Sequence, residues 1–260
     1  MKNNDTFSKT LLVAVTLCLV CSTLISFTAV GLRDIQDANK ELDKQTKILS
    51  AAGLLNNNLN ISDLFKSIEV KMVNLETGLF DESIDSSTFN EGSFSRNLDT
   101  SIKLDKTQDV ATLKRRENYQ SVYLHYEEGN LVSIILPVRG YGLWGTMKGY
   151  LALEPDLQTI IGLEFFEDKE TPGLGAEINN PKWKSKWTGK KIYSSEGEVI
   201  VSVIKGVVLP DSSNKDYSVD GLSGATITSK GVTNLLKFWL GDLGYGPFIT
   251  NMRNGEIKDV

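Results

Sequence analysis

Apolar side chains divide the sequence into a long uninterrupted apolar segment, a mixed region and a strand-rich second half. Residues 11–32 contain no charged side chain. As a helix, which rises 1.5 Å per residue, this segment would be about 33 Å long and would cross a bilayer. A cleavable signal peptide usually has a shorter apolar region of about 7–15 residues, and no A-x-A cleavage site follows this one. The pattern therefore favours a retained transmembrane helix after a short polar tail at residues 1–10.

The region after the apolar segment predicts a juxtamembrane helix followed by short elements. Residues 33–53 are rich in charge with apolar residues at intervals, and Gly53 suits the end of a helix because glycine tolerates a positive φ. The pattern then weakens. It predicts a helix at residues 61–65, a strand at 68–75, a surface loop to about residue 100 and a helix at 108–116.

From residue 121 the alternation of apolar and polar residues is typical of strands joined by turns. The predicted strands cover residues 121–126, 131–138, 148–153, 159–166 and 199–205, with a short helix within 178–187. Residues 127–130 and 154–156 read as hairpin turns. Helical spacing then relates five apolar residues, namely Val232, Leu235, Leu236, Trp239 and Leu240. Consecutive hairpins before a terminal helix predict an α+β fold, with an antiparallel sheet and flanking helices in one domain at residues 54–260.

Residues 140–145 read G-Y-G-L-W-G and match the G-x-G-x-x-G fingerprint of dinucleotide-binding proteins. That fingerprint must open a helix, because the helix N-terminus holds the pyrophosphate of the cofactor. A strand is predicted directly after Gly145, so we interpret the string as a glycine-rich turn between antiparallel strands.

Composition excludes several classes of chemistry. The net charge of −5 argues against nucleic acid as a partner. His125 is the single histidine of the chain and falls in a predicted strand, where a structural role is the better interpretation. The two cysteines, Cys18 and Cys21, lie inside the apolar segment, so a Cys/His zinc site cannot form in the soluble part. No metal site is predicted.

A run of small and hydroxylated residues, 220–229, directly precedes the terminal helix. The first amide groups of a helix lack intrahelical partners and carry a partial positive charge, which favours an anion such as phosphate. Thr228 or Ser229 acting as an ordinary helix cap is the competing interpretation. Spacing alone does not decide between the two.

Four strings occur in an order that is found in a known family. They are G-L-W-G at residues 142–145, E-T-P-G-L-G at 170–175, S-G-A-T at 223–226 after Asp220, and F-W-L-G-D-L-G-Y-G-P-F at 238–248. With the N-terminal apolar segment, they make the chain resemble the C subunits of the Na+-translocating NADH:quinone reductases. The first two strings also occur in the G subunits of the related Rnf complexes, whereas the last favours the C subunits of the reductases. Residues 54–118 contain no matching string.

The resemblance implies a covalent FMN, joined through its phosphate to the Thr226 hydroxyl by a flavin transferase that requires Mg2+ and uses FAD. It also implies a single-pass protein of the bacterial inner membrane with a large periplasmic domain. The chain would relay electrons with five other subunits in an enzyme that oxidises NADH on another subunit, reduces ubiquinone and pumps Na+. Basic residues on the two sides of the apolar segment do not settle its orientation, so the periplasmic placement rests on the resemblance.

The strings supply the candidate site residues. Besides Thr226 as the attachment point, the predicted cofactor-binding residues are Leu143, Trp144, Glu170, Thr171, Leu174, Gly175, Lys205, Ser223, Gly224, Ala225 and Thr228. Leu143 and Trp144 are candidates for packing against the flat isoalloxazine ring, with a core position as the alternative for Trp144. Glu170 either hydrogen-bonds the ring or organises its turn. Lys205 either neutralises charge on the flavin or phosphate or is simply solvated.

Two other functions remain open on sequence grounds. The chain could be the flavin-carrying G subunit of an Rnf-type complex that exchanges electrons with ferredoxin. It could instead be a membrane-anchored extracytoplasmic binding or sensor module without a cofactor. A flavin that stays on the protein after denaturation distinguishes the last function from the other two.

Overall fold

A computed structural model describes residues 6–55 and 60–257 of the chain. They form two compact units, one up to Lys44 and one from Gln45 onward, with the boundary inside helix α2. The first unit consists of α1 (Phe7–Gly31) and the first part of α2 (Arg33–Ala51). Helix α1 is long and apolar enough to cross a membrane, with a mean hydropathy of 2.3. This agrees with the predicted transmembrane helix, although α1 begins at Phe7 rather than at residue 11.

The end of α2 belongs to the second unit and is closed by glycine as predicted. Gly53 has a φ of +71°. The Leu54 amide donates a hydrogen bond of 2.9 Å to the Leu49 carbonyl, which satisfies one of the carbonyl groups left free at the helix end. Ile48 and Leu49 on the last turns of α2 are fully buried in this unit.

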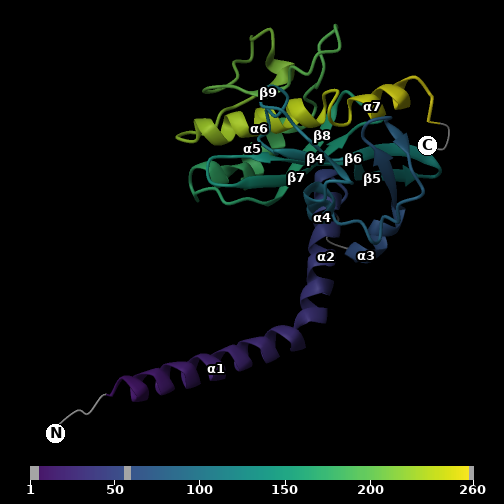
Figure 1. The fold of residues 1–260 in the computed structure, drawn as a ribbon. Helices are drawn as coiled ribbons and strands as arrows, with labels where there is room; N and C mark the ends of the chain where they lie inside the picture. Colours follow the sequence, from purple (N-terminus) through teal and green to yellow (C-terminus); the bar gives the residue numbers. More distant parts are fainter. Residues whose placement is uncertain (1–5, 56–59, 258–260) are drawn as a thin grey trace. The chain divides into compact units, whose positions relative to one another are not determined.

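A six-stranded antiparallel sheet is the centre of the second unit (Figure 1). Its spatial order is β2-β1-β5-β6-β7-β8. The strands are β1 (Ile68–Asn74), β2 (Leu79–Phe80), β5 (Tyr119–Glu127), β6 (Asn130–Tyr141), β7 (Thr146–Leu153) and β8 (Ile160–Glu167). The predicted hairpins lie between β5 and β6 and between β7 and β8. In the first, Glu128 and Gly129 both have a positive φ, the conformation that a tight hairpin turn demands.

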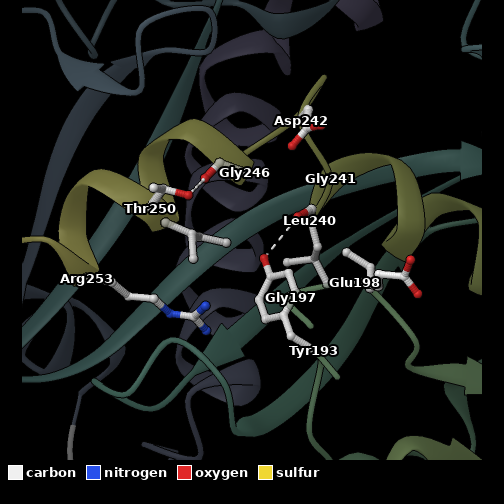
Figure 2. A pocket seen from close by; sticks show the side chains of 11 residues that line it. Tyr193, Gly197, Glu198, Leu240, Gly241, Asp242, Gly246, Thr250 and Arg253 are labelled. Atoms are coloured by element: carbon white, nitrogen blue, oxygen red, sulfur yellow. Dashed lines mark hydrogen bonds between the residues drawn. The ribbon is translucent and has the colours of Figure 1, made fainter. Parts of the chain in front are cut away.

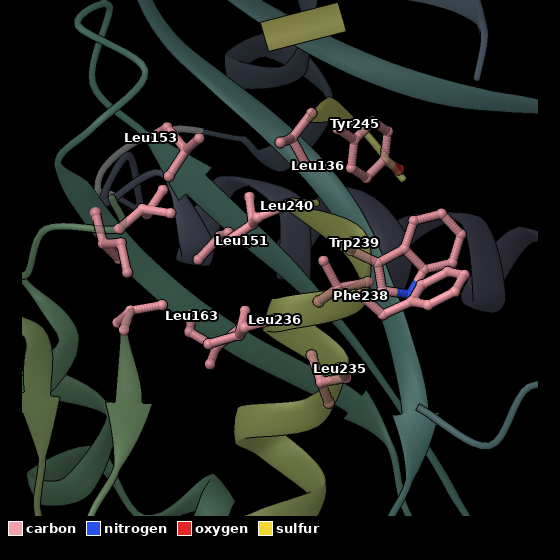
Figure 3. Close-up of a cluster of buried hydrophobic side chains, with 14 of the residues drawn as sticks. Leu136, Leu151, Leu153, Leu163, Leu235, Leu236, Phe238, Trp239, Leu240 and Tyr245 are labelled. Atoms are coloured by element: carbon pink, nitrogen blue, oxygen red, sulfur yellow. The ribbon is translucent and has the colours of Figure 1, made fainter. Parts of the chain in front are cut away.

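Helix α6 (Thr226–Trp239) packs on one face of the sheet, chiefly against β6, and forms the main core. Side chains alternate between the two faces of a strand, so Ile134, Leu136 and Val138 point to this face. Figure 3 shows the apolar side of α6 lying against leucines of the sheet. The helical stripe predicted from sequence is buried, with each of its five residues at most 1% exposed.

The opposite face of the sheet has its own smaller core. Tyr123, Ile135 and Tyr150 come from positions that alternate with those of the main core. They pack with Ile48 and Leu49 from the end of α2. The described part of the second unit therefore has helix, sheet and helix in three layers, with the sheet buried on both sides.

Shorter elements connect these layers. The remaining helices and strands are α3 (Ile61–Leu64), η1 (Phe65–Ser67), α4 (Glu91–Arg96), β3 (Ser101–Lys103), β4 (Arg115–Glu117), η2 (Gly175–Asn179), α5 (Pro181–Lys184), η3 (Ser185–Trp187), β9 (Ser202–Val203), η4 (Lys215–Tyr217), β10 (Ser218–Val219) and α7 (Gly246–Arg253).

Three sequence predictions of secondary structure were wrong in part or in full. The predicted loop up to residue 100 contains β2 and α4, and the strand predicted at residues 199–205 is reduced to β9, which pairs in parallel with β10. The helix predicted at residues 108–116 is absent, because Thr112 and Lys114 have positive φ: residues 108–114 form turns, and residues 115 and 116 belong to β4. The Asp109 carboxylate stabilises these turns by accepting hydrogen bonds from the amides of Leu113 and Lys114.

A buried ionic cluster joins α4 to the sheet. Arg139 of β6 forms ion pairs with Glu91 of α4 and Glu117 of β4, and its guanidinium lies 5.6 Å from the centre of the Trp239 ring. Burial raises the pKa of Glu117 to about 7, against the opposing effect of Arg139. The cluster explains why a short helix with few apolar residues is held in place beside the sheet.

The close approach of α6 to the β6–β7 turn gives a stability prediction. A Cβ atom on Gly231 of α6 would lie 2.5 Å from the Tyr141 carbonyl oxygen and 3.0 Å from Met147. Gly231→Ala should therefore destabilise the fold, although alanine normally stabilises a helix by about 1 kcal/mol over glycine. Thermal unfolding of the detergent-solubilised chain, followed by near-UV circular dichroism, measures the change.

Gly92→Ala is the matched control, because Gly92 is also helical and a Cβ there would meet only ordinary contacts at 3.5 Å or beyond. This variant should unfold at the same temperature as the parent or a higher one. Equal effects of the two substitutions would contradict the packing of α6 described above.

Candidate functional site

Thr226 is the first residue of α6, and its side chain is exposed. Ala225 precedes the helix and has no side-chain acceptor, so no side chain caps the first amide groups. These groups point out of the helix start, where the helix dipole favours an anion. The interpretation of Thr228 or Ser229 as the helix cap was wrong. Both residues lie within the first turns of α6 and are buried.

The loop before Thr226 is exposed to solvent near Thr226 and is held by a hydrogen bond and an ion pair at Asp220. Ser223 and Gly224 are exposed, and Gly224 has a φ of +71°, a conformation that glycine adopts without strain. Asp220 accepts a hydrogen bond of 2.8 Å from the Val208 amide and pairs with Lys186. Burial alone would raise the pKa of Asp220, but these two interactions outweigh it and lower the pKa below its ordinary value.

A cavity of about 220 Å³ opens beside Thr226. It is lined by residues 203–206, Gly221, Leu222, Thr226, Ser229 and Lys230. Lys205, predicted from sequence, is thus near Thr226, and Lys230 is a further cation that the sequence reasoning missed. The helical spacing between Thr226 and Lys230 could have identified this lysine, because residues four apart on a helix share a face. The cavity therefore combines two cationic side chains, a free hydroxyl and a helix N-terminus, which together suit a phosphate.

Glu170 links two of the sequence strings, G-L-W-G and E-T-P-G-L-G, to the first turn of α6. Its side chain accepts hydrogen bonds from the amides of Leu143 and Trp144 and from the hydroxyl of Thr228. The G-L-W-G turn and the segment after β8 are therefore both fastened to the first turn of α6. Gly175 is part of the same contact, because a Cβ atom there would overlap Glu170 and Thr228.

Apolar side chains are exposed on the segments that Glu170 joins. Trp144 is 63% exposed, and Leu143 and Leu174 are 41% and 43% exposed. The alternative of Trp144 as a core residue was wrong. Leu174 lies against Gly224 of the S-G-A-T string, and the Thr171 carbonyl accepts hydrogen bonds from the amides of Leu174 and Ala176.

These residues fit FMN. Exposed indole and leucine side chains beside a helix start offer apolar surface to a flat ring, and the free amides with the nearby lysines offer charge to its phosphate. The contacts of the individual residues with the ring stay predictions. The G-x-G-x-x-G string spans the last two residues of β6 and the turn to strand β7, in agreement with its interpretation as a turn between antiparallel strands.

A second cavity of about 390 Å³ lies between residues 193–199 and the turn from α6 to α7 (Figure 2). The guanidinium of Arg253 lies 4.7 Å from the centre of the Tyr193 ring, and the Tyr193 hydroxyl donates to the Leu240 carbonyl. None of the predicted site residues lines this cavity. The sequence reasoning did not identify it, although Gly241 and Asp242 belong to the terminal string.

The other residues considered in the sequence analysis do not line the cavity beside Thr226. His125 is buried in β5, and burial lowers the pKa of its ring despite the nearby Glu127. Cys18 and Cys21 lie in α1 as free thiols. Within residues 6–55 and 60–257, no group of three or more His, Cys, Asp or Glu side chains could hold a metal ion.

Comparisons with known proteins identify the domain and the family of this chain. Residues 142–241 match the FMN-binding domain family. The chain is 45% identical to the C subunit of the Na(+)-translocating NADH-quinone reductase of Pseudomonas aeruginosa, over 98% of this chain and 100% of the relative. It is 44% identical to the corresponding C subunit of Vibrio alginolyticus, over 98% of this chain and 99% of the relative.

Solved structures show the same relationship. The crystal structure of NqrC from Shewanella oneidensis superposes with a TM-score of 0.76 at 34% identity, covering 83% of this chain and 99% of that one. The C subunit of the Parabacteroides distasonis reductase gives a TM-score of 0.61 at 32% identity, covering 84% and 97%. The chain therefore belongs to the family of C subunits of the Na(+)-translocating NADH-quinone reductases.

Proposed function

We propose that this chain carries FMN as a phosphoester on Thr226 and relays electrons within a Na+-translocating NADH:quinone reductase. The observation that carries the proposal is the exposed Thr226 hydroxyl at the uncapped start of α6. Two lysines line the cavity beside it, and the exposed Leu143, Trp144 and Leu174 belong to the segments that Glu170 fastens to this helix. When bound, the flavin supplies reversible one- and two-electron redox chemistry.

Attachment needs only a hydroxyl that a second enzyme can reach. The Thr226 oxygen would form a bond to the phosphorus of the FMN half of FAD. The phosphorus–oxygen bond to the AMP half would break, releasing AMP, and the hydroxyl proton would pass to the flavin transferase. Ser223 and Gly224 are exposed ahead of Thr226, so this approach is not covered by side chains of the loop itself. Lys205 and Lys230 would offset the charge of the phosphodiester that forms.

The chain's residues would hold the cofactor without taking part in acid–base chemistry, because electron transfer requires no proton acceptor at this site. Leu143 and Trp144 would cover one part of the ring and Leu174 another. Membership of the family and the apolar helix α1 support a place in a membrane complex with five other subunits. We propose further that α1 spans the inner membrane once, with residues 45–260 on the periplasmic side.

Removing the attachment hydroxyl gives the first test. Thr226→Ala should abolish the FMN-sized mass adduct and the ultraviolet fluorescence of the protein band after denaturing electrophoresis, since only a covalent flavin survives denaturation. Thr226→Ser keeps a hydroxyl and should be flavinylated at reduced yield. Thr250→Ala, at an exposed threonine of α7, should keep the full adduct. An undiminished adduct on Thr226→Ala would show that the attachment site is wrong.

The exposed indole gives a second test. Trp144→Ala should leave the unfolding temperature of the chain nearly unchanged, because the side chain is 63% exposed. It should nevertheless raise the fluorescence yield of the attached flavin, because indole in contact with the ring quenches emission. Trp187→Ala is the contrasting variant and should lower the unfolding temperature strongly, since Trp187 is fully buried. An unaltered flavin emission in Trp144→Ala would remove the indole from the site.

The assignment to a complex is tested in membranes of the native host. Purification of the tagged chain should recover an NADH-oxidising subunit, and Thr226→Ala should eliminate Na+-stimulated quinone reduction by NADH while leaving the recovered subunits unchanged. Recovery of a ferredoxin-dependent complex would contradict the proposal.

A further inference from the structure

The Glu170 side chain forms an unusual buried carboxylate site. The residue is 7% exposed. One oxygen, Oε1, lies 2.9 Å from the Leu143 amide nitrogen and 3.0 Å from that of Trp144. The other, Oε2, lies 2.5 Å from the Thr228 hydroxyl oxygen. An ionised glutamate accepts hydrogen bonds at both oxygens, which matches these three donor groups.

Two glycines make room for this carboxylate. A Cβ atom on Gly142 would overlap Oε1, and one on Gly175 would overlap Oε2. The glycines of the G-L-W-G and E-T-P-G-L-G strings are therefore needed where the Glu170 carboxylate passes. One side chain therefore accounts for a glycine in each of two strings, and its carboxylate accepts hydrogen bonds from the backbone amides of Leu143 and Trp144.

The charge of Glu170 has no cationic partner among the described residues, since no Lys, Arg or His forms an ion pair with it. Its three donors are two backbone amides and a hydroxyl. Glu164 shows the contrast, because it is equally buried but pairs with both Lys47 and Lys184. Hydrogen bonds from neutral groups stabilise a buried charge without cancelling it, so the field of Glu170 extends into its surroundings.

We propose that Glu170 is a positioning residue that holds the Leu143–Trp144 turn at the start of α6, and that its negative charge lowers the reduction potential of the flavin. The inference rests on the proposed function, because it requires a flavin beside Leu143 and Trp144. A fixed negative charge near the ring disfavours the gain of an electron. Glu170 thus determines both the position of the Leu143–Trp144 turn and the reduction potential of the flavin.

Glu170→Gln separates the charge from the geometry. The glutamine oxygen still accepts from the two amides, and its NH2 group donates to Thr228, whose hydroxyl turns to accept. The midpoint potential of the flavin on the purified full-length chain should become more positive. A unit charge about 10 Å away, at an effective dielectric constant of about 20, changes the reduction equilibrium on the order of tenfold. This equals about 59 mV for a one-electron step.

Glu167→Gln is the matched control, because Glu167 is an exposed carboxylate three positions earlier and pairs with Lys148. Solvent screens its charge, so the potential should stay at the parent value. A potential that is unchanged in Glu170→Gln, or that shifts equally in both variants, would overturn the role of the Glu170 charge.

A readout on the flavin-free chain tests the positioning role. In a Thr226→Ala background, Glu170→Ala should speed hydrogen exchange at the Leu143 and Trp144 amides by at least tenfold, because both lose their acceptor. Glu170→Gln should restore slow exchange. Equal exchange in all three chains, with the fold intact by circular dichroism, would refute the positioning role. A parent chain that carries no flavin would refute the proposed function instead, and this exchange result would still stand.

Discussion

The packing of α6 across β6 is the interaction on which the candidate site depends. The two elements approach so closely that Gly140 and Gly231 have no space for a side chain, since Leu235 and the Tyr141 carbonyl occupy it. The Trp239 indole donates a hydrogen bond of 2.7 Å to the Arg139 carbonyl and fixes the far end of the helix on the same strand. The start of α6 must then lie where β6 ends, beside the turn to β7. The neighbourhood of Thr226 and the G-L-W-G turn is therefore a product of the core and not of the loop alone.

Glu164 and Glu170, two of the buried glutamates of the second unit, illustrate different solutions to one physical problem. Taking a carboxylate out of water is costly unless its charge is paired or its lone pairs are hydrogen-bonded. At Glu164 two lysines supply the compensation, and the charge is cancelled locally. At Glu170 only neutral donors do so. A protein that needed Glu170 for stability alone would gain as much from an ion pair, so the choice of neutral donors points to a use for the charge.

The antiparallel sheet was predictable because its strands alternate cleanly and their hairpins carry turn residues such as Gly129. The apolar stripe of α6 was equally clear, from Val232 to Leu240. Residues 108–116 were mistaken for a helix because their charges resemble a solvated helix face. What prevents the helix is the Asp109 carboxylate, whose hydrogen bonds stabilise turns with positive φ. Helix α7 was missed because its start, Gly246-Pro247, reads as a turn.

The candidate site was predictable only in part, for a different reason. Thr226 and its partners came from a resemblance between strings, and local spacing alone left a phosphate site and a helix cap open. The link through Glu170 joins residues that are 27 and 58 positions apart, a separation at which periodicity carries no information. Lys230 was within reach of helical spacing from Thr226. The exposure of Trp144 could not be predicted from the sequence, because a tryptophan in a glycine-rich turn is compatible with a position in the core or on the surface.

If Thr226 is the attachment site proposed above, the anchoring of Asp220 has a consequence for the biogenesis of the protein. Its backbone carbonyl accepts a hydrogen bond from the Trp183 indole, and its side chain pairs with Lys186, so the acceptor loop is tied to a distant helical segment. An unfolded chain lacks this tie, and its loop before Thr226 has no fixed conformation. A modifying enzyme that reads the loop as it stands here must meet a finished tertiary surface. Modification would then follow folding, and a misfolded copy would be left unmodified and thereby sorted from competent ones.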